Sequence, residues 1–327
     1  MRHLPLLILL LIATPLITVM PLPARAAPEQ ISVGVYVADI QEIDLKSHSY
    51  RLDFYAWFRW KDPAIDPSKS AEFINMFDPA DHVRTSLYDS PQKMPDGSFY
   101  TIIRDQGKFS SKFSLQRYPF DQQALPIIIE DNIHEASDLI YVADVSAKAP
   151  LTLNPQIYLP GFSIGQTTLN ISNFTYPTNF GDLRTTTQPD YSRAVFSIPV
   201  ERPWLATGLK IFMPVLLILL CTALVLNIHP VYIEGRLGVV ITALLTLVAL
   251  QLTSASGLPE VDYMLMTDKV YLLSYLFIIA TLMQVVRHSN AVHEKSFESV
   301  WRQDIRMRNI FCLAMLAGLT LVVVSTV

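Results

Sequence analysis

Between residues 28 and 200, apolar and polar side chains alternate along several short segments, as they do in β-strands. Apolar residues occupy every second position through 31–37 and again through 52–58. Further strand-like runs, separated by turn residues, cover 125–129, 139–142 and 193–200. Several short strands with regular turns predict an antiparallel, immunoglobulin-like sandwich. Within this half, helical periodicity is visible only at 68–75.

From Trp204 onward the chain contains long apolar runs instead. Four of them, each close to the roughly 20 residues that span a bilayer, cover 205–228, 237–252, 270–286 and 310–327. The second run is the most polar, since it carries Thr242, Thr246, Gln251 and Thr253. A helix with those side chains is expected to face water or protein rather than lipid. The pattern predicts a β-sandwich domain over 27–201 and a four-helix transmembrane domain over 202–327.

The amino terminus has the order of a secretory signal peptide. A short basic start, Met1-Arg2-His3, precedes an apolar stretch that ends at Met20, and Ala24-Arg25-Ala26 forms a small-x-small cleavage site. We expect cleavage after Ala26, so that residues 1–26 are removed. The alternative is a retained anchor helix. Cleavage places the start of the mature chain outside the cytoplasm.

Basic residues predict the orientation of the helices, because cytoplasmic loops are enriched in lysine and arginine. The connection between the third and fourth apolar runs holds Arg287, Lys295, Arg302, Arg306 and Arg308. The connection between the second and third runs holds only Lys269. We therefore expect a multi-pass protein of the cell inner (plasma) membrane, with the third-to-fourth connection in the cytoplasm. The N-terminal domain and the C-terminus then share the periplasmic or extracellular side.

Composition narrows the function classes. Of the 327 residues, 51% are apolar and 17% are charged, whereas a soluble domain averages about 25% charged. The formal charge of −4 argues against a nucleic-acid partner. The two cysteines, Cys221 and Cys312, sit in apolar runs, which excludes a disulfide-stapled ectodomain and a cysteine metal site. No nucleophile motif, metal-binding His/Glu spacing or pair of intramembrane acids is visible, so neither an enzyme nor a cofactor or metal is predicted.

One segment, Arg117-Tyr118-Pro119-Phe120-Asp121-Gln122-Gln123, has a specific pattern. Its Tyr-Pro-Phe-Asp core resembles the signature loop of the pentameric ligand-gated ion channels, the Cys-loop receptor superfamily. Eukaryotic members flank that core with two cysteines, whereas this chain has Ser111 and Leu125 at the corresponding positions. The chain therefore resembles the bacterial branch, which lacks the cysteine bridge. Further matches to the family are Trp60-Lys61-Asp62, Phe77-Asp78-Pro79, Arg202, Pro214 and Leu258-Pro259.

The resemblance implies a homopentamer in which the second apolar helix surrounds a central pore. Counting back from Pro259 by the family's spacing places Glu234 at the inner mouth and Arg236 at the helix start, turned away from the pore. The pore-lining face is then Glu234, Gly238, Thr242, Leu245, Ala249, Leu252 and Ser256. Their steps of three and four residues form one stripe of a helix.

The chemistry of this stripe predicts a mechanism. Five Glu234 carboxylates form a negative ring that attracts cations, unless this acid only stabilises the helix start. A ring of Leu245 forms an apolar constriction that stops ions by dewetting, and Leu252 is the candidate for a second ring. Ordinary helix packing is the alternative for both leucines. The expected partners are therefore permeant inorganic cations inside the pore and membrane lipid around it.

The resemblance also predicts how the two domains communicate. It pairs Asp121 with Arg202 at the domain junction and adds a third acid from the first hairpin. Asp44 is the preferred candidate for that acid, and Asp39 and Glu42 are the alternatives. Pro259 and Tyr263 lie in the outer turn that the sandwich would push.

The family binds its ligand between neighbouring sandwiches, beneath a hairpin that corresponds here to about 179–190. Candidate ligand-binding residues are Phe77, Tyr158, Phe162, Phe180 and Tyr191, with Tyr55 and Arg104 from the neighbouring chain. Aromatic rings there suit a cation, and an arginine suits a carboxylate. The alternative is that these residues belong to the sandwich core. His82 and His134 are candidates for an agonist role of protons.

The predicted function is a cation-selective pentameric ligand-gated ion channel, opened by a small molecule or by protons at the extracellular domain. The alternative is a non-conducting periplasmic solute receptor that signals through a membrane partner. That alternative predicts no pore stripe and a larger cytoplasmic segment. The chain has the stripe and only a short connection between its third and fourth apolar runs.

Overall fold

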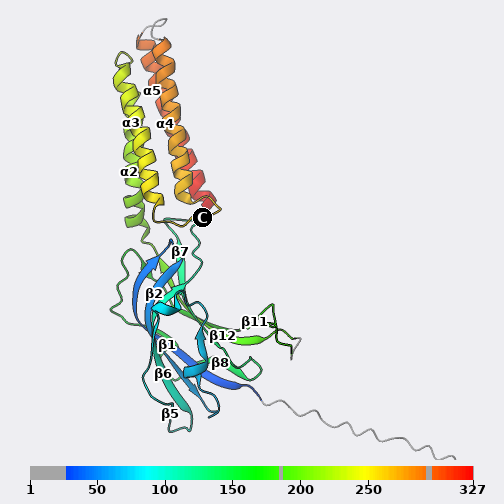
Figure 1. Ribbon diagram of the computed structural model, residues 1–327. Helices are drawn as coiled ribbons and strands as arrows, with labels where there is room; N and C mark the ends of the chain where they lie inside the picture. Colours follow the sequence, from blue (N-terminus) through cyan, green and yellow to red (C-terminus); the bar gives the residue numbers. More distant parts are fainter. Residues whose placement is uncertain (1–26, 184–186, 292–296, 327) are drawn as a thin grey trace, which may run out of the picture.

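The computed structural model describes residues 27–183, 187–291 and 297–326. A β-domain forms one end of the molecule, and four long helices stand side by side at the other (Figure 1). This arrangement confirms the predicted fold class, a β-sandwich followed by a four-helix transmembrane domain. The predicted signal peptide, residues 1–26, lies outside the described residues.

Two sheets make up the β-domain. The larger sheet has the order β4–β6–β2–β1–β8, with β5 paired to β6 and β9 paired to β1. Its strands are β1 (Glu29–Asp44), β2 (Ser49–Trp60), β4 (Val83–Ser86), β5 (Gln92–Lys93), β6 (Phe99–Ser110), β8 (Leu139–Ala143) and β9 (Leu151–Leu153). The smaller sheet has the order β10–β12–β7–β3, with β11 paired to β12. Its strands are β3 (Ala71–Phe73), β7 (Gln122–Asp131), β10 (Ser163–Ile164), β11 (Thr168–Thr175) and β12 (Asp190–Glu201).

The prediction of an antiparallel sandwich is wrong at one edge of the larger sheet. Strands β8 and β9 both pair with β1 in the parallel direction. The chain enters β8 from β7, which belongs to the smaller sheet, so it reaches β1 by a crossover between sheets. Parallel neighbours need such a crossover, because a tight hairpin can join only antiparallel strands.

The period of two places large apolar side chains between the sheets. On β2, Leu52, Phe54 and Phe58 are inaccessible to solvent, while Arg51 on the opposite face is half-buried. The ring of Phe54 packs edge-on against Phe73 of β3, with 5.1 Å between their centroids. Because these two rings come from different sheets, they hold the sandwich together.

The helical prediction for 68–75 is correct only at its start. Helix α1 covers Pro67–Ser70, and the Asp66 side chain caps it by accepting a hydrogen bond from the Ser68 N–H at 3.2 Å. The chain then becomes β3, which pairs with β7. Pairing at a sheet edge satisfies the backbone there, and this tertiary contact overrides a weak helical preference. A short 3₁₀ helix, η1 (Pro79–Asp81), follows.

Four helices form the second domain: α2 (Trp204–Val225), α3 (Ile233–Ala255), α4 (Met266–Ala291) and α5 (Phe297–Thr326). Each is long and apolar enough to cross a membrane, which confirms the four predicted spans. Pro214 lies inside α2. The C-terminal end of α5 lies beside the β-domain (Figure 1), as an even number of crossings requires.

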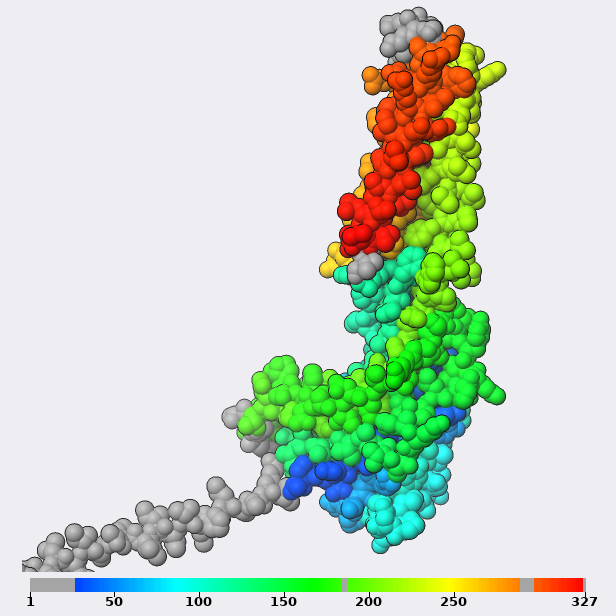
Figure 2. All heavy atoms as spheres, turned by 180° about the vertical axis from the view of Figure 1, so that it is seen from behind, coloured from blue at the N-terminus to red at the C-terminus, as the bar shows by residue number. Residues whose placement is uncertain are grey.

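Figure 2 shows how the two parts differ in outline, since the region of β11 and the start of β12 projects sideways from the sandwich and α5 runs along one side of the bundle. The buried face of α3 consists of Arg236, Val240, Ala243 and Leu247. Most of the other described residues of α3 are exposed in the single chain.

Candidate functional site

The predicted pore stripe coincides with the unpacked face of α3. All seven of its residues are exposed: Glu234, Gly238, Thr242, Leu245, Ala249, Leu252 and Ser256. The side chains of Leu245 and Leu252 are 64% and 69% exposed. The isolated chain therefore leaves open the same helix face that the family spacing selects, and it packs the opposite face.

The polar residues that distinguish α3 from the other helices divide into two groups. The hydroxyls of Thr246 and Thr253 donate to carbonyls one turn earlier in their own helix, at 2.7 and 2.9 Å. Gln251 accepts a hydrogen bond from the hydroxyl of Tyr275 on α4 at 2.6 Å. Each of these three side chains thus has a hydrogen-bond partner within the chain. Thr242 and Glu234 lie on the exposed stripe, and Thr246 and Thr253 are exposed beside it.

Arg236 points away from the stripe, as expected, and it is completely buried. Its guanidinium forms an ion pair with Asp304 of α5, with 2.7 Å between Nη2 and Oδ2. Asp304 also contacts Nδ1 of His288 of α4 at 2.6 Å. Sequence reasoning missed Asp304 and His288. Asp304 lies among the charged residues that precede the apolar part of α5, so the sequence pattern alone did not single it out.

The predicted ion pair at the domain junction is present. Arg202 Nε lies 3.2 Å from Asp121 Oδ1, and the Gln123 amide donates to the other carboxylate oxygen at 2.7 Å. The Arg202 guanidinium also lies over the rings of Phe162 and Tyr118, at 4.4 and 5.4 Å from their centroids. Asp121 is buried, so its charge depends on these partners.

Asp44, the preferred third acid, does not join this pair. Its carboxylate accepts hydrogen bonds from the Lys46 N–H at 2.9 Å and from the Ser47 hydroxyl at 2.6 Å, within its own turn. The Ser47 hydroxyl is the main reason that the pKa of Asp44 lies below its usual value. The turn between β1 and β2 thus uses this acid locally, because turn backbones offer it closer donors.

The signature loop and the residues just before it contact helix α2 and the connection between α3 and α4. Phe120 packs against Phe212 of α2 at 6.0 Å between centroids, and it covers Gly208, where a Cβ would lie 3.2 Å from the ring. The Leu115 N–H donates to the Tyr263 hydroxyl at 3.0 Å. The Met266 N–H, at the start of α4, donates to the Gln116 carbonyl at 3.1 Å. The loop region therefore contacts both α2 and the start of α4.

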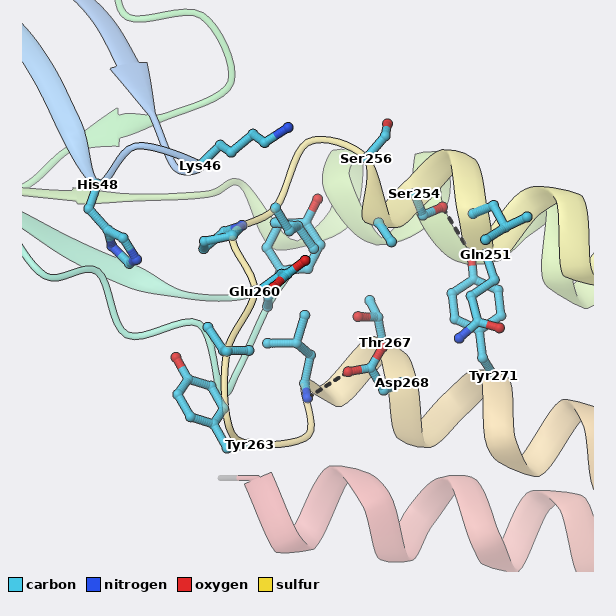
Figure 3. Close-up of a pocket in the computed structure, with 17 residues that line it drawn as sticks. Lys46, His48, Gln251, Ser254, Ser256, Glu260, Tyr263, Thr267, Asp268 and Tyr271 are labelled. Atoms are coloured by element: carbon cyan, nitrogen blue, oxygen red, sulfur yellow. Dashed lines mark hydrogen bonds between the residues drawn. The ribbon is translucent and has the colours of Figure 1, made fainter.

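A cavity of about 840 Å³ lies between the β1–β2 turn and the outer ends of α3 and α4 (Figure 3). Its lining includes the charged or ionisable side chains of Lys46, His48, Glu260 and Asp268. Pro259 and Tyr263, the predicted residues of the outer turn, line it as well. The structure thus brings the first hairpin and the α3–α4 connection to one space, as the coupling prediction expects.

The predicted ligand residues fall into separate places. Phe180 and Tyr191 meet at Tyr176, at 5.3 and 5.8 Å between centroids, beside the loop that joins β11 to β12. Tyr55 and Arg104 lie together on the outward face of the larger sheet, where Arg104 binds Asp53 through two hydrogen bonds of 2.9 and 2.6 Å.

The remaining three ligand candidates lie elsewhere. Phe77 and Tyr158 are 46% and 80% exposed. Phe162 packs on Arg202 at the junction, so the structure gives it a role in domain contact instead.

The aromatic cluster around Tyr176 contains an ion pair that sequence reasoning missed. Tyr176 donates to Glu130 at 2.9 Å, and Arg193 also binds Glu130. The Arg193 guanidinium lies 3.5 Å from the centroid of Phe174. Partial burial and the hydrogen bond to Glu130 raise the pKa of Tyr176. The cluster is thus already occupied by a cation of the protein, whose charge Glu130 balances.

The two candidate histidines differ in their surroundings. His82 is buried between Asp105 and the Lys108 carbonyl, which lie 2.9 Å from Nδ1 and 2.6 Å from Nε2. Asp105 also accepts from Arg84. Each nitrogen of the His82 ring therefore faces an oxygen that can accept a hydrogen bond. His134 has one such partner, Asp131, at 2.9 Å.

These features together define a class. A β-sandwich, a proline-containing loop held against helix ends and four membrane-length helices form the fold of the Cys-loop channels. The chain is thus a multi-pass membrane protein with the architecture of a pentameric ligand-gated channel.

The comparisons support the same class. The chain is similar to the proton-gated ion channel of Gloeobacter violaceus, with 22% identity over 286 residues that cover 82% of this chain and 75% of the relative. No protein-family model matches the chain. The relative confirms the resemblance that the signature loop indicated, and it belongs to a class of proteins that conduct ions.

Proposed function

We propose that the protein is a homopentameric, cation-selective channel that protons open. Residues 27–201 form its periplasmic ligand-sensing domain and 202–327 its pore domain in the inner membrane. The observation that carries this proposal is the stripe on α3, because its seven predicted residues are all exposed while the opposite face is buried. Five copies arranged around an axis would turn that stripe toward water.

The stripe supplies the parts that a gated pore needs. Glu234, in the first turn of α3, places a carboxylate at the mouth, where five copies attract cations and repel anions. Leu245 and Leu252 supply two apolar rings higher up, and such rings block ions while they stay dry. The orientation rests on the basic residues near the α4–α5 connection and on the predicted signal peptide.

Protons are the favoured agonist for two reasons. The Gloeobacter relative is named a proton-gated ion channel. His82 is buried with an acceptor oxygen within hydrogen-bond distance of each ring nitrogen. A small molecule at the Tyr176 cluster is the second candidate, and an amine would have to compete there with Arg193 for Glu130.

Currents through the reconstituted protein test the proposal. We expect a step from pH 7.5 to about 5 to open a current in a planar bilayer. Under a salt gradient, the reversal potential should lie near that of the cation. Glu234→Gln should lower cation conductance and weaken the preference over chloride. His82→Gln should demand a lower pH for opening, whereas His134→Gln serves as the matched control.

Three results would contradict parts of this proposal. A reversal potential at the chloride value would remove cation selectivity. If protons evoke no current but an amine or a carboxylate does, protons are not the agonist and that small molecule is. A stable monomer in detergent that conducts nothing under any condition would favour the non-conducting receptor instead.

A further inference from the structure

A charged cluster lies buried at the end of the bundle that points away from the sandwich. Arg236 at the start of α3 and Asp304 near the start of α5 are both inaccessible to solvent. His288, near the end of α4, contacts the second oxygen of Asp304 at 2.6 Å. The Gln284 amide lies 3.0 Å from His288 Nε2 and 3.4 Å from Asp304 Oδ1. Three helices thus converge on one carboxylate.

This cluster begins two residues from the acid that we place at the pore mouth. Successive helical residues turn by about 100°, so Glu234 and Arg236 point to nearly opposite sides. Glu234 is exposed and Arg236 is buried, in agreement with that geometry. Because the Arg236 side chain points to the opposite side, its positive charge is kept away from the Glu234 ring.

The carboxylate of Asp304 compensates the buried positive charge of Arg236. Among the described residues, Arg236 Nε and Nη1 have no hydrogen-bond partner, so the guanidinium depends on its single bond to Asp304. An arginine cannot lose its proton to escape an apolar site. Without the carboxylate, the arginine would have to turn toward solvent, and Glu234, two residues earlier, is exposed to it.

We propose that Asp304, through its buried ion pair with Arg236, is a positioning residue for ion selectivity. It holds five arginines away from the pore mouth and cancels their charge, while His288 and Gln284 fix its orientation. The inference rests on the proposed cation channel. It assigns a selectivity role to a residue of α5, although the predicted pore stripe lies on α3.

Removing the charge of Asp304 and removing the charge of Arg236 should change ion selectivity to different extents. In Asp304→Asn the arginine stays charged, so it opposes the Glu234 ring and the cation-to-chloride permeability ratio should fall on the order of tenfold. In Arg236→Gln the stranded carboxylate can take up a proton or share the charge of a protonated His288, so selectivity should stay near that of wild type. The double variant should recover wild-type selectivity.

The experiment measures reversal potentials of these channels in planar bilayers under a salt gradient. The matched control is Glu298→Gln, which strands Arg302 in an exposed pair on the same helix, with 70% and 73% of these side chains accessible. We expect no change in its selectivity. A purely structural role for Asp304 would lower the amount of assembled channel and leave the reversal potential unchanged, and that result would overturn the proposal.

If Asp304→Asn alone fails to assemble, mixed pentamers with wild-type subunits decide the question. A graded loss of cation preference with the share of variant subunits supports the proposal, and an unchanged preference overturns it. A chloride reversal in the wild-type channel would contradict the proposed function itself. Cation selectivity that persists in Asp304→Asn would contradict only this inference.

Discussion

The sandwich and the helix bundle bury their apolar side chains to different extents within one chain. Leu52 and Phe54 of β2 are inaccessible, and the sandwich core continues through both sheets. In the bundle, large apolar side chains stay open on all four helices, and Leu321 of α5 is 69% exposed. The sandwich completes its core alone, whereas the bundle requires lipid on some faces and protein copies on others.

The exposed faces of α3 and α5 also differ in the chemistry of their side chains. The exposed side chains in the second half of α5 are almost all apolar, which suits lipid. The exposed stripe of α3 begins with a carboxylate and includes Thr242 and Ser256. A charged group facing lipid is costly, so an exposed face that carries one indicates water or another subunit. Exposure in one chain therefore becomes informative once the chemistry of the exposed residues is considered.

The largest expected effect tests whether the sandwich core is self-sufficient. Phe54→Ala should destabilise the protein by about 3–5 kcal/mol, because it removes a fully buried ring that packs on Phe73. Denaturant unfolding of the purified channel, followed by tryptophan fluorescence, measures the change. Leu252→Ala removes an exposed side chain and should leave the sandwich transition unaltered. Equal losses from both variants would contradict the comparison.

The next prediction concerns the point where the two regions meet. Asp121→Asn leaves Arg202 without its carboxylate partner, at a cost of about 3 kcal/mol or more in a buried site. We expect fewer assembled channels and impaired opening. The exposed pair of Arg51 with Asp81 provides the control, since Asp81→Asn should cost at most about 1 kcal/mol. Normal gating in Asp121→Asn would show that this pair does not couple the domains.

A smaller effect is expected from the exposed face of α3. Leu245→Thr should wet the apolar ring and favour the open state by on the order of 1 kcal/mol, because the hydroxyl replaces apolar surface. The expected result is leak current at neutral pH or opening at a less acidic pH. An unchanged pH response, together with a leak from Leu252→Thr, would place the gate one ring higher.

The smallest effect concerns the β1–β2 turn, where the pKa of Asp44 is lowered mainly by the Ser47 hydroxyl. A lowered pKa in the folded state means that this bond stabilises the protein above the unfolded value of about 3.9, and that the gain disappears as pH falls through the folded value. Ser47→Ala should therefore cost about 0.5–1 kcal/mol at pH 6 and progressively less below pH 4. A loss that is independent of pH would show that the carboxylate is not involved.

Local sequence determined much of this protein. Alternation along 31–37 and 52–58 predicted β1 and β2, because the pleat itself has a period of two. Apolar runs of bilayer length predicted α2 to α5. The Tyr118-Pro119-Phe120-Asp121 core, through its resemblance to the channel family, predicted the loop whose Phe120 packs on α2. The spacing from Pro259 selected the face of α3 that the structure leaves open.

Only the tertiary structure decided which distant residues meet. Three contacts join segments that are far apart in the chain. Strand β8 pairs with β1 in the parallel direction, Tyr176 and Arg193 bind Glu130, and Arg236 forms an ion pair with Asp304. The hydrophobic pattern of a segment predicts whether it forms a helix or a strand. It does not predict which other element that segment contacts, because this depends on how whole helices and strands pack together. Asp44 illustrates the limit, since its own turn supplied closer donors than the junction it was expected to join.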